Sequence, residues 1–456
     1  MRAEPMRLPG LNALRAAGMF GVVVLHAGVP YTVAPMPGLA WPVGHHRTSP
    51  WIDGLFWAIE GSIMPLFFTI SGYCAAQGLA KLGPRAYVGR RIRRILFPFV
   101  AAAIILLPLE FYIWLLGWVV EGRLPLHKLR SLKLGPLYRD LWGFSHLWYL
   151  EYLILLSLGY AAWRAWRSRL EQAKLRLRSR RSFKAAVASP PTLAAQRVPL
   201  HTRATGEKGI PRQRLERVRQ PWLAASVVRL WQGNLSLAFL ATATASTAVL
   251  WWSPETVAGF QHGFLPFPAK FAFSAVFFLY GIGLDGRRPS AWIWGEVWAG
   301  ASLALFALVW PAIHVQVTAG LSGWPRLGFG LAAGLFSTAA VTACWMLFVG
   351  RKSLDTPAAA YLAGASFWVY LVHHPLMGLC QIAFSLTSWP AELQFLADLA
   401  ITLIVTLASY EVLVRKTWLG IFLEGWQKKA SSAAPTEAAG ETGSPPLGGE
   451  VTPKAA

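Results

Sequence analysis

Long apolar stretches separated by short polar segments recur along the whole chain of 456 residues. Each stretch is close to the length of about 20 residues that a helix needs to cross a hydrocarbon core of about 30 Å. The stretches are continuous and do not alternate between apolar and polar positions, which favours membrane-spanning helices over the strands of a barrel. The pattern predicts ten spans, at roughly 12–34, 51–79, 95–120, 142–163, 235–252, 267–285, 291–315, 325–349, 358–384 and 392–414.

The composition supports a chain that lies in a membrane. Hydrophobic residues make up 55% of the sequence and charged residues only 14%, whereas soluble domains carry about 25% charged residues. This balance excludes a disordered protein, a disulfide scaffold and a conventional cytosolic enzyme. The three cysteines lie inside apolar stretches without the spacing of metal ligands, and we interpret them as packing residues. The predicted fold is an all-α integral membrane protein with about ten transmembrane helices.

Basic residues give the chain a formal net charge of +22 and also predict its orientation. If the N-terminus is cytoplasmic, the inner segments through residue 429 hold 32 Lys and Arg, and the outer segments hold eight. Cytoplasmic loops of multi-pass proteins carry such an excess of basic residues. We therefore expect both termini to be cytoplasmic.

The segment 164–219 interrupts the apolar pattern with sixteen basic and three acidic residues. We interpret it as a cytoplasmic linker, whose first part, Arg164 to Arg181, can also form a basic helix on anionic lipid headgroups. A nucleic-acid arm is disfavoured because aromatic residues are not interleaved with the basic ones. The predicted organisation is a first membrane half of about four helices, a basic linker, a second membrane half of about six helices and a disordered tail, at 8–165, 166–221, 222–425 and 426–456.

Two ionisable residues in the first span are the most informative positions, because such residues are costly in a membrane. Arg15 and His26 are eleven residues apart, close to three helical turns, and therefore share one helix face about 16 Å apart along the axis. A purely structural interpretation has Arg15 reaching the headgroups and His26 bonding a neighbouring helix. Spacing alone does not separate that interpretation from a functional one.

The end of the second span and the segment after it contain two further motifs. Ser71 and Gly72, in the stretch Leu66 to Tyr73, permit close contact between helices. A cluster of four arginines follows, which serves as a topology signal or grips phosphate groups in bidentate fashion. Its members are Arg90, Arg91, Arg93 and Arg94.

The fourth and ninth spans carry aromatic and polar residues together. The fourth opens with His146 and Trp148, which are typical of an interfacial anchor or of a sugar-stacking site. The ninth carries a polar stripe at helical spacing, made of Ser366, Tyr370 and either His373 or His374. Adjacent histidines point about 100° apart, so we expect only one of them to serve a given site.

The sequence offers no clear metal site and several acids without an assignable partner. No second ligand pair stands at a spacing that would complete a zinc site with the paired histidines, so no metal ligands are predicted. The unassigned acids in or beside spans are Glu60, Glu110, Glu296, Asp398 and Glu411.

Taken together, these motifs resemble the membrane acyltransferase-3 family, and within it the glucan biosynthesis protein C (glucan succinyltransferase) group. Arg15 and His26 are similar to the family's Arg-x10-His signature, and Leu66 to Tyr73 to its Phe-Phe-x-x-Ser-Gly-Tyr stretch. The run Arg90 to Pro98 resembles its basic segment before the third span. The glucan group in particular is suggested by Ser145 to Leu150, Tyr370 to Pro375 and Tyr410-Glu411.

This resemblance implies a multi-pass protein of the bacterial inner membrane that transfers an acyl group from cytoplasmic acyl-coenzyme A to a glycan hydroxyl. In the glucan group the acyl group is succinyl and the acceptor is a periplasmic osmoregulated glucan; an acetyl donor is the other option. Acyl-coenzyme A is then a donor substrate, and no bound cofactor is expected. The expected partners are the donor, the glycan and membrane lipids, with no nucleic acid and an open oligomeric state.

The resemblance also suggests roles for the residues singled out above. His26 acts as general base on the acceptor hydroxyl or carries the acyl group as an acyl-imidazole. Arg15 holds the donor phosphates or stabilises the oxyanion, and the separation of about 16 Å favours donor binding. The four arginines of the basic cluster assist at the phosphates. The acceptor side or the pore is formed by His146, Trp148, Ser366, Tyr370 and His373.

Two other functions fit parts of the pattern. Ten spans with buried Arg and His also suit a transporter or flippase of a glycan or lipid-linked sugar, although paired broken helices in two related halves are not recognisable. The basic segment 164–219 can alternatively serve as a scaffold for a cytoplasmic partner. Consumption of the thioester distinguishes an enzyme from a carrier, because a carrier leaves acyl-coenzyme A intact.

Overall fold

A computed structural model of the chain describes residues 8–127, 141, 143–188, 235–285 and 293–423, and within these ranges it contains helices and no strands. This agrees with the all-α class expected from the continuous apolar runs. The predicted tail at 426–456 and most of the predicted linker lie outside the described residues. The main helices are α1 (Leu11–Gly28), α2 (Pro50–Leu82), α3 (Pro84–Arg91), α4 (Phe97–Val120), α6 (Trp148–Ala188), α8 (Leu235–Trp252), α10 (Pro268–Gly283), α11 (Ile293–Thr318), α12 (Gly323–Phe348), α13 (Pro357–Ser385) and α14 (Ala391–Ser409).

Short elements connect these helices. Two of them are π-helical segments, one between α3 and α4 and the other after α14. The short elements are η1 (Val29–Tyr31), η2 (Ile92–Leu96), η4 (Ser145–Leu147), α9 (Glu255–Ala258), η6 (Lys352–Leu354), η7 (Tyr410–Val414) and α15 (Trp418–Leu423).

Eight helical segments among the described residues are long and apolar enough to cross a membrane. The helix α10 is shorter and apolar, and α6 begins at the fourth predicted span but is not one of the eight. The structure therefore supports a multi-pass membrane protein, while the count of ten spans and the orientation of the termini stay predictions. The eight segments are Leu11–Tyr31, Pro50–Leu82, Pro84–Val120, Leu235–Trp252, Trp294–Thr318, Gly323–Phe348, Pro357–Ser385 and Ala391–Val414.

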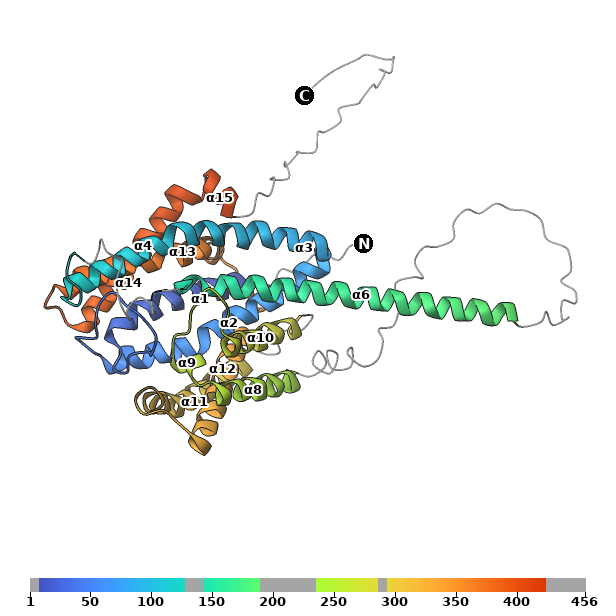
Figure 1. The fold of residues 1–456 in the computed structure, drawn as a ribbon, viewed down its shortest axis with the longest axis horizontal. Coiled ribbons are helices and arrows are strands. Elements are labelled where there is room, and N and C mark those ends of the chain that lie inside the picture. The colour runs from blue at the N-terminus through green and yellow to red at the C-terminus, as the bar shows by residue number, and fades with distance from the viewer. Residues whose placement is uncertain (1–7, 128–140, 142, 189–234, 286–292, 424–456) are drawn as a thin grey trace, which may run out of the picture.

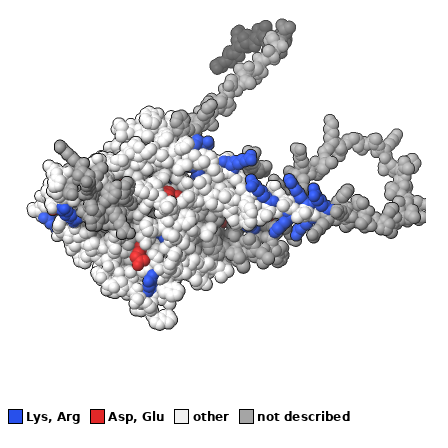
Figure 2. Space-filling view, in the orientation of Figure 1, with Lys and Arg blue, Asp and Glu red and all other residues white. Residues whose placement is uncertain are grey.

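The helix α6 differs from the basic surface helix that the sequence suggested. It runs without a break for 41 residues, so the fourth predicted span and the basic segment from Arg164 onward form one helix. Figure 1 shows its second half projecting away from the helical bundle, and Figure 2 shows Lys and Arg gathered on that projection. The basic residues thus continue the axis of the span, because the interrupting prolines begin only at Pro190, after the helix has ended.

The bundle is centred on α1 and α2. The helix α1 contacts α2, α13 and α14, and α2 also contacts α10 and α12. In Figure 1, α4, α13 and α15 lie on one side of this central pair, and α8, α11 and α12 lie on the other. The first span is therefore surrounded by other helices, with most of its side chains buried.

The glycine of the second-span motif is required by the packing of α2 on α10. A Cβ atom added at Gly72 would overlap the carbonyl oxygen of Phe278, and one added at Gly281 would overlap that of Thr69. The two glycines therefore let the two backbones touch, and Thr69 adds a 3.3 Å hydrogen bond from its hydroxyl to Phe277 O. The expectation that this motif serves close helix contact fits this geometry.

We expect Gly72→Ala to lower the free energy of unfolding by about 1–3 kcal/mol, because the new methyl group meets backbone atoms that cannot move alone. Gly159→Ala is the matched control: Gly159 also lies within a helix, and its added Cβ would meet nothing within 4 Å. Thermal unfolding in detergent measures both variants. A transition midpoint for Gly72→Ala equal to that of Gly159→Ala would contradict the packing role.

Candidate active site

Four histidine rings from three parts of the chain meet inside the bundle. His26 comes from α1, His146 from η4 before α6, and His373 and His374 from α13. The His26 ring centroid lies 5.1 Å from that of His373 and 4.9 Å from that of His374. The rings of His146 and His374 stack at 4.5 Å. These contacts define the histidine cluster, in which His146, His373 and His374 are buried.

Both histidines of the pair on α13 contact His26, whereas their angular separation had predicted only one at a given site. The backbone directions do diverge by about 100°. His26 enters between the two imidazoles, meeting His373 at an interplanar angle of 35° and His374 at 82°. Two diverging rings can therefore bracket a third ring that approaches between them.

The hydrogen bonds of His373 determine which nitrogen of His26 carries its proton. His373 Nδ1 lies 2.9 Å from the carbonyl oxygens of both Val369 and Tyr370. Carbonyl oxygens only accept, so Nδ1 is the donor, and Nε2 of the neutral His373 ring is an acceptor. His26 Nδ1, at 2.9 Å from that Nε2, must then be protonated. A neutral His26 therefore has an unprotonated Nε2, which is the form needed for a base or a nucleophile.

A buried carboxylate lies on the other side of the cluster. Glu110, from α4, places Oε1 2.8 Å from His146 Nδ1 and 3.3 Å from His374 Nδ1. Glu110 is only 4% exposed, as are both of these histidines. The sequence had left this acid without a partner, because Glu110, His146 and His374 are far apart along the chain.

Two tryptophan rings stack on the histidine cluster, and one of them, Trp41, comes from the loop after η1. The Trp41 ring stacks on His26 at a centroid distance of 6.1 Å, and Trp114 stacks on His374 at 5.1 Å. The indole of Trp41 donates a 2.6 Å hydrogen bond to Gln381 Oε1, and the Trp118 indole donates to Trp41 O at 2.8 Å. Sequence reasoning missed Trp41 and Gln381, since neither lies in a recognisable motif.

A large basic cavity, which we call the inner cavity, opens on the His373 side of the cluster. Its volume is about 1150 Å³. Arg15 lines it together with three of the four arginines of the basic cluster, and Arg93 is the member that does not. Arg91 is oriented by Tyr87, whose hydroxyl accepts a 2.9 Å hydrogen bond from its Nε. Other polar residues of the lining include Ser71, Tyr149, Ser366, Tyr370, His373, Arg415 and Lys416.

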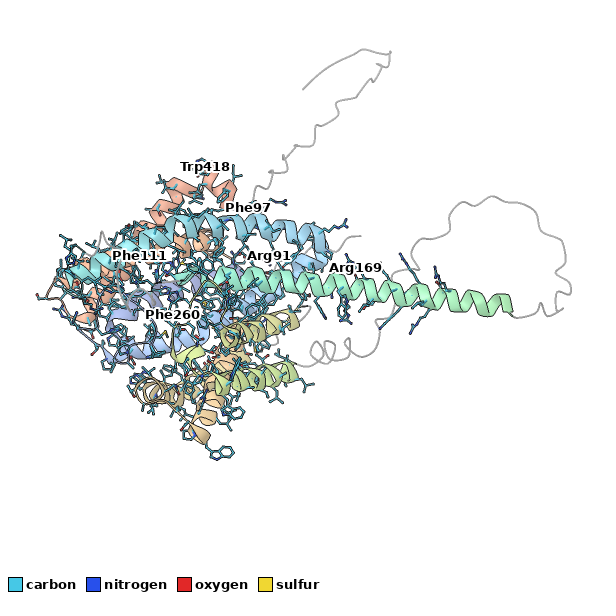
Figure 3. All side chains as sticks on the ribbon, viewed as in Figure 1. Arg91, Phe97, Phe111, Arg169, Phe260 and Trp418 are labelled. Carbon is cyan, nitrogen blue, oxygen red and sulfur yellow. The ribbon has the colours of Figure 1, made fainter. Side chains whose placement is uncertain are left out.

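A small pocket of about 60 Å³, which we call the outer pocket, lies on the other side of the cluster. Three histidines of the cluster, His26, His146 and His374, line it together with Glu110. His26 thus faces the outer pocket and its hydrogen-bond partner His373 faces the inner cavity. Figure 3 shows the two ends: Phe111 and Phe260, which line the outer pocket, lie farther from the projecting half of α6 than Arg91, which lines the inner cavity.

The structure separates the predicted site residues into three groups. Arg15, Ser366, Tyr370 and His373 line the inner cavity with most of the basic cluster, whereas His26 and His146 line the outer pocket. Trp148 lines neither space, and its ring instead covers the ammonium group of Lys270 at 3.7 Å. The polar stripe on α13, made of Ser366, Tyr370 and His373, was predicted to form the acceptor side or the pore. In the structure it lines the inner cavity together with the arginines.

Comparison with known proteins finds one match, to a family of protein domains. Residues 8–202 match the acyltransferase-domain family, acyltransferase 3, and this match supports the resemblance found in the sequence motifs. No curated protein and no solved structure matches the chain. The first part of the chain is thus similar to an acyltransferase domain, and the apolar helices indicate a multi-pass membrane protein. The finer resemblance to the glucan group stays a prediction, because no named relative supports it.

Proposed function

We propose that the protein is a membrane O-acyltransferase that takes an acyl group from acyl-coenzyme A in the inner cavity and passes it to a glycan hydroxyl in the outer pocket. The observation that carries this proposal is the His26–His373 pair, which stands between the two spaces with one ring lining each. An enzyme whose donor and acceptor arrive from opposite faces of a membrane needs its reactive group at such a boundary.

The inner cavity fits the donor by charge and size. Coenzyme A carries several phosphate charges, and guanidinium groups bind phosphate oxygens in bidentate fashion. Arg15, Arg90, Arg91 and Arg94 line the cavity, whose volume of about 1150 Å³ is generous for a cofactor site. Arg15 is about 16 Å from His26 along α1, so phosphates held near Arg15 leave room for the pantetheine arm to carry the thioester to the histidine pair.

The chemistry proposed for His26 is general base catalysis. The unprotonated Nε2 takes the proton of the acceptor hydroxyl while the hydroxyl oxygen attacks the thioester carbonyl. The tetrahedral intermediate collapses with cleavage of the carbon–sulfur bond, and the leaving thiolate takes the proton back from His26. The products are a glycan ester and free coenzyme A. His373 keeps the required tautomer in place, because its own Nδ1 is committed to the backbone of α13.

The proposal is tested in membrane vesicles that contain the protein, with vesicles from cells lacking it as the control. Labelled succinyl- and acetyl-coenzyme A are supplied separately with a periplasmic glycan fraction shown to contain the native glycan. We expect one donor to release free thiol and to label the glycan in equal amounts. Intact thioester with both donors, together with movement of glycan across the membrane, would establish a carrier in place of an enzyme.

A further inference from the structure

The groups around Glu110, whose contacts with two histidines also fit a buried ion pair, have separations compatible with a metal site. The Glu110 carboxylate and the imidazoles of His146 and His374 offer three ligand atoms that lie within 4.8 Å of one another. Two of these separations, from Glu110 Oε1 to the two Nδ1 atoms, are 2.8 and 3.3 Å. Ligands held about 2.0–2.1 Å from a tetrahedral zinc ion are separated by about 3.3 Å.

If the His146 ring is neutral, its short contact with Glu110 is unfavourable unless a cation lies nearby. His146 Nε2 is 3.3 Å from the carbonyl oxygen of Leu371, which only accepts, so Nε2 carries the ring proton. Nδ1 of the neutral ring is then a lone pair directed toward a carboxylate oxygen 2.8 Å away. A backbone carbonyl that fixes the tautomer in this way is the usual outer partner of a metal-binding histidine.

These contacts also depart from the geometry of hydrogen bonds in which the nitrogens donate to the carboxylate. His146 Nδ1, His374 Nδ1 and both Glu110 oxygens are buried, and within the described part of the chain none makes a hydrogen bond of acceptable geometry. The separations of 2.8 and 3.3 Å therefore bring these atoms together without a well-formed hydrogen bond between them. Buried polar atoms without hydrogen bonds are costly, and a bound cation would satisfy all of them together.

We propose that Glu110, His146 and His374 bind a divalent transition-metal ion, and that zinc is the ion this donor set favours. Two imidazoles and one carboxylate form a common set of three protein ligands at zinc sites that keep a fourth position open. All three ligands also line the outer pocket, so the open position faces that space. The sequence did not predict this site, because the three ligands come from α4, η4 and α13, which only the fold brings together.

The bound ion would give the outer pocket a Lewis acid next to His26. If the proposed acyl transfer is correct, a hydroxyl of the acceptor entering this pocket can take the fourth position. Metal binding itself does not depend on that function, since it follows from the three ligands alone. The two proposals can therefore fail separately.

The test is the metal content of the purified full-length protein in detergent, prepared with an affinity tag that contains no histidine. We expect about one zinc per chain, and a loss of at least tenfold in Glu110→Gln and in His374→Gln. His373→Gln is the matched control, because it removes the adjacent histidine of the same helix but no proposed ligand. An equal metal content in all four proteins would overturn the proposal.

A second measurement on the unmodified chain covers the case in which the ligand variants fail to fold. The protein is stripped with a chelator and titrated with Co²⁺ alone, whose visible absorption is intense only in tetrahedral or five-coordinate sites. We expect this absorption to saturate at one Co²⁺ per chain and to be displaced by Zn²⁺. Absence of saturable absorption, with the stripped protein still folded by thermal unfolding, would overturn the site. Acyl transfer is measured on the same samples, so transfer by a preparation that shows no saturable absorption would overturn the metal site and leave the proposed function standing.

Discussion

Replacing His26 with alanine is expected to lower acyl transfer by about 10²–10⁴-fold, the range over which positioned general bases contribute. The variant loses the ring that forms the hydrogen-bonded pair with His373, contacts His374 and lines the outer pocket. It keeps the fold, since the ring of His26 is a small part of the α1 surface and the helix is packed mainly by apolar residues. The measurement is labelled glycan formed per unit of protein in vesicles, with free thiol followed in parallel.

The control for this variant is His127→Ala, which also removes one imidazole. His127 is exposed, lies beyond the end of α4 and lines neither the inner cavity nor the outer pocket. We expect its transfer rate to equal that of the unmodified protein. Near-normal transfer by His26→Ala at equal membrane content would show that the base is another group and would remove the central step of the proposed mechanism.

The sequence predicted the all-helical class, most of the long apolar helices and the shared helix of Arg15 and His26, because these depend on local periodicity. Hydrophobic length fixes where a helix crosses the membrane, and a spacing of eleven residues fixes a common helix face. The structure agrees that Arg15 and His26 belong to one helix and places them at the two different spaces. The distance between Arg15 and His26 along the helix axis could therefore be predicted. The inner cavity beside Arg15 and the outer pocket beside His26 could not.

The rest of the site could not be predicted because it depends on contacts between distant segments. Glu110 looks like an isolated acid in α4, and its two histidine neighbours come from later parts of the chain. Trp41 lies in a loop and reaches the cluster only because Gln381 and the Trp118 indole hold it there. A motif records which residues are near one another in sequence, and these residues are near one another only in the folded bundle.

The arginines of the basic cluster allow a sharp test of donor binding, because adjacent residues of the same chemistry have different positions. Arg91 lines the inner cavity and is held by Tyr87, both through a hydrogen bond and through its ring at 5.0 Å. Arg93 is exposed and does not line the cavity. The two side chains stand within one helical turn and contribute equally to the local positive charge.

We expect Arg91→Gln to raise the KM for acyl-coenzyme A by about 10–100-fold, which corresponds to the loss of one charge-assisted hydrogen bond of about 1.5–3 kcal/mol. Arg93→Gln is expected to change KM less than about twofold, because an exposed charge is screened by solvent and salt. The effect on kcat is expected to be small in both, since the phosphates are remote from the reacting carbonyl. Steady-state thiol release at saturating glycan measures both constants.

Comparison of these two variants separates local binding from general electrostatic attraction. If the inner cavity holds the donor phosphates, only substitutions of arginines that line the cavity should raise the KM for acyl-coenzyme A. Arg15→Gln should then resemble Arg91→Gln, although Arg15 lies on α1 and not in the basic cluster. If the arginines act only as a topology signal, all three substitutions remove one charge each and should have similar effects on insertion and little effect on KM. Equal KM values for Arg91→Gln and Arg93→Gln would therefore place the donor outside the inner cavity, even if His26 proves essential.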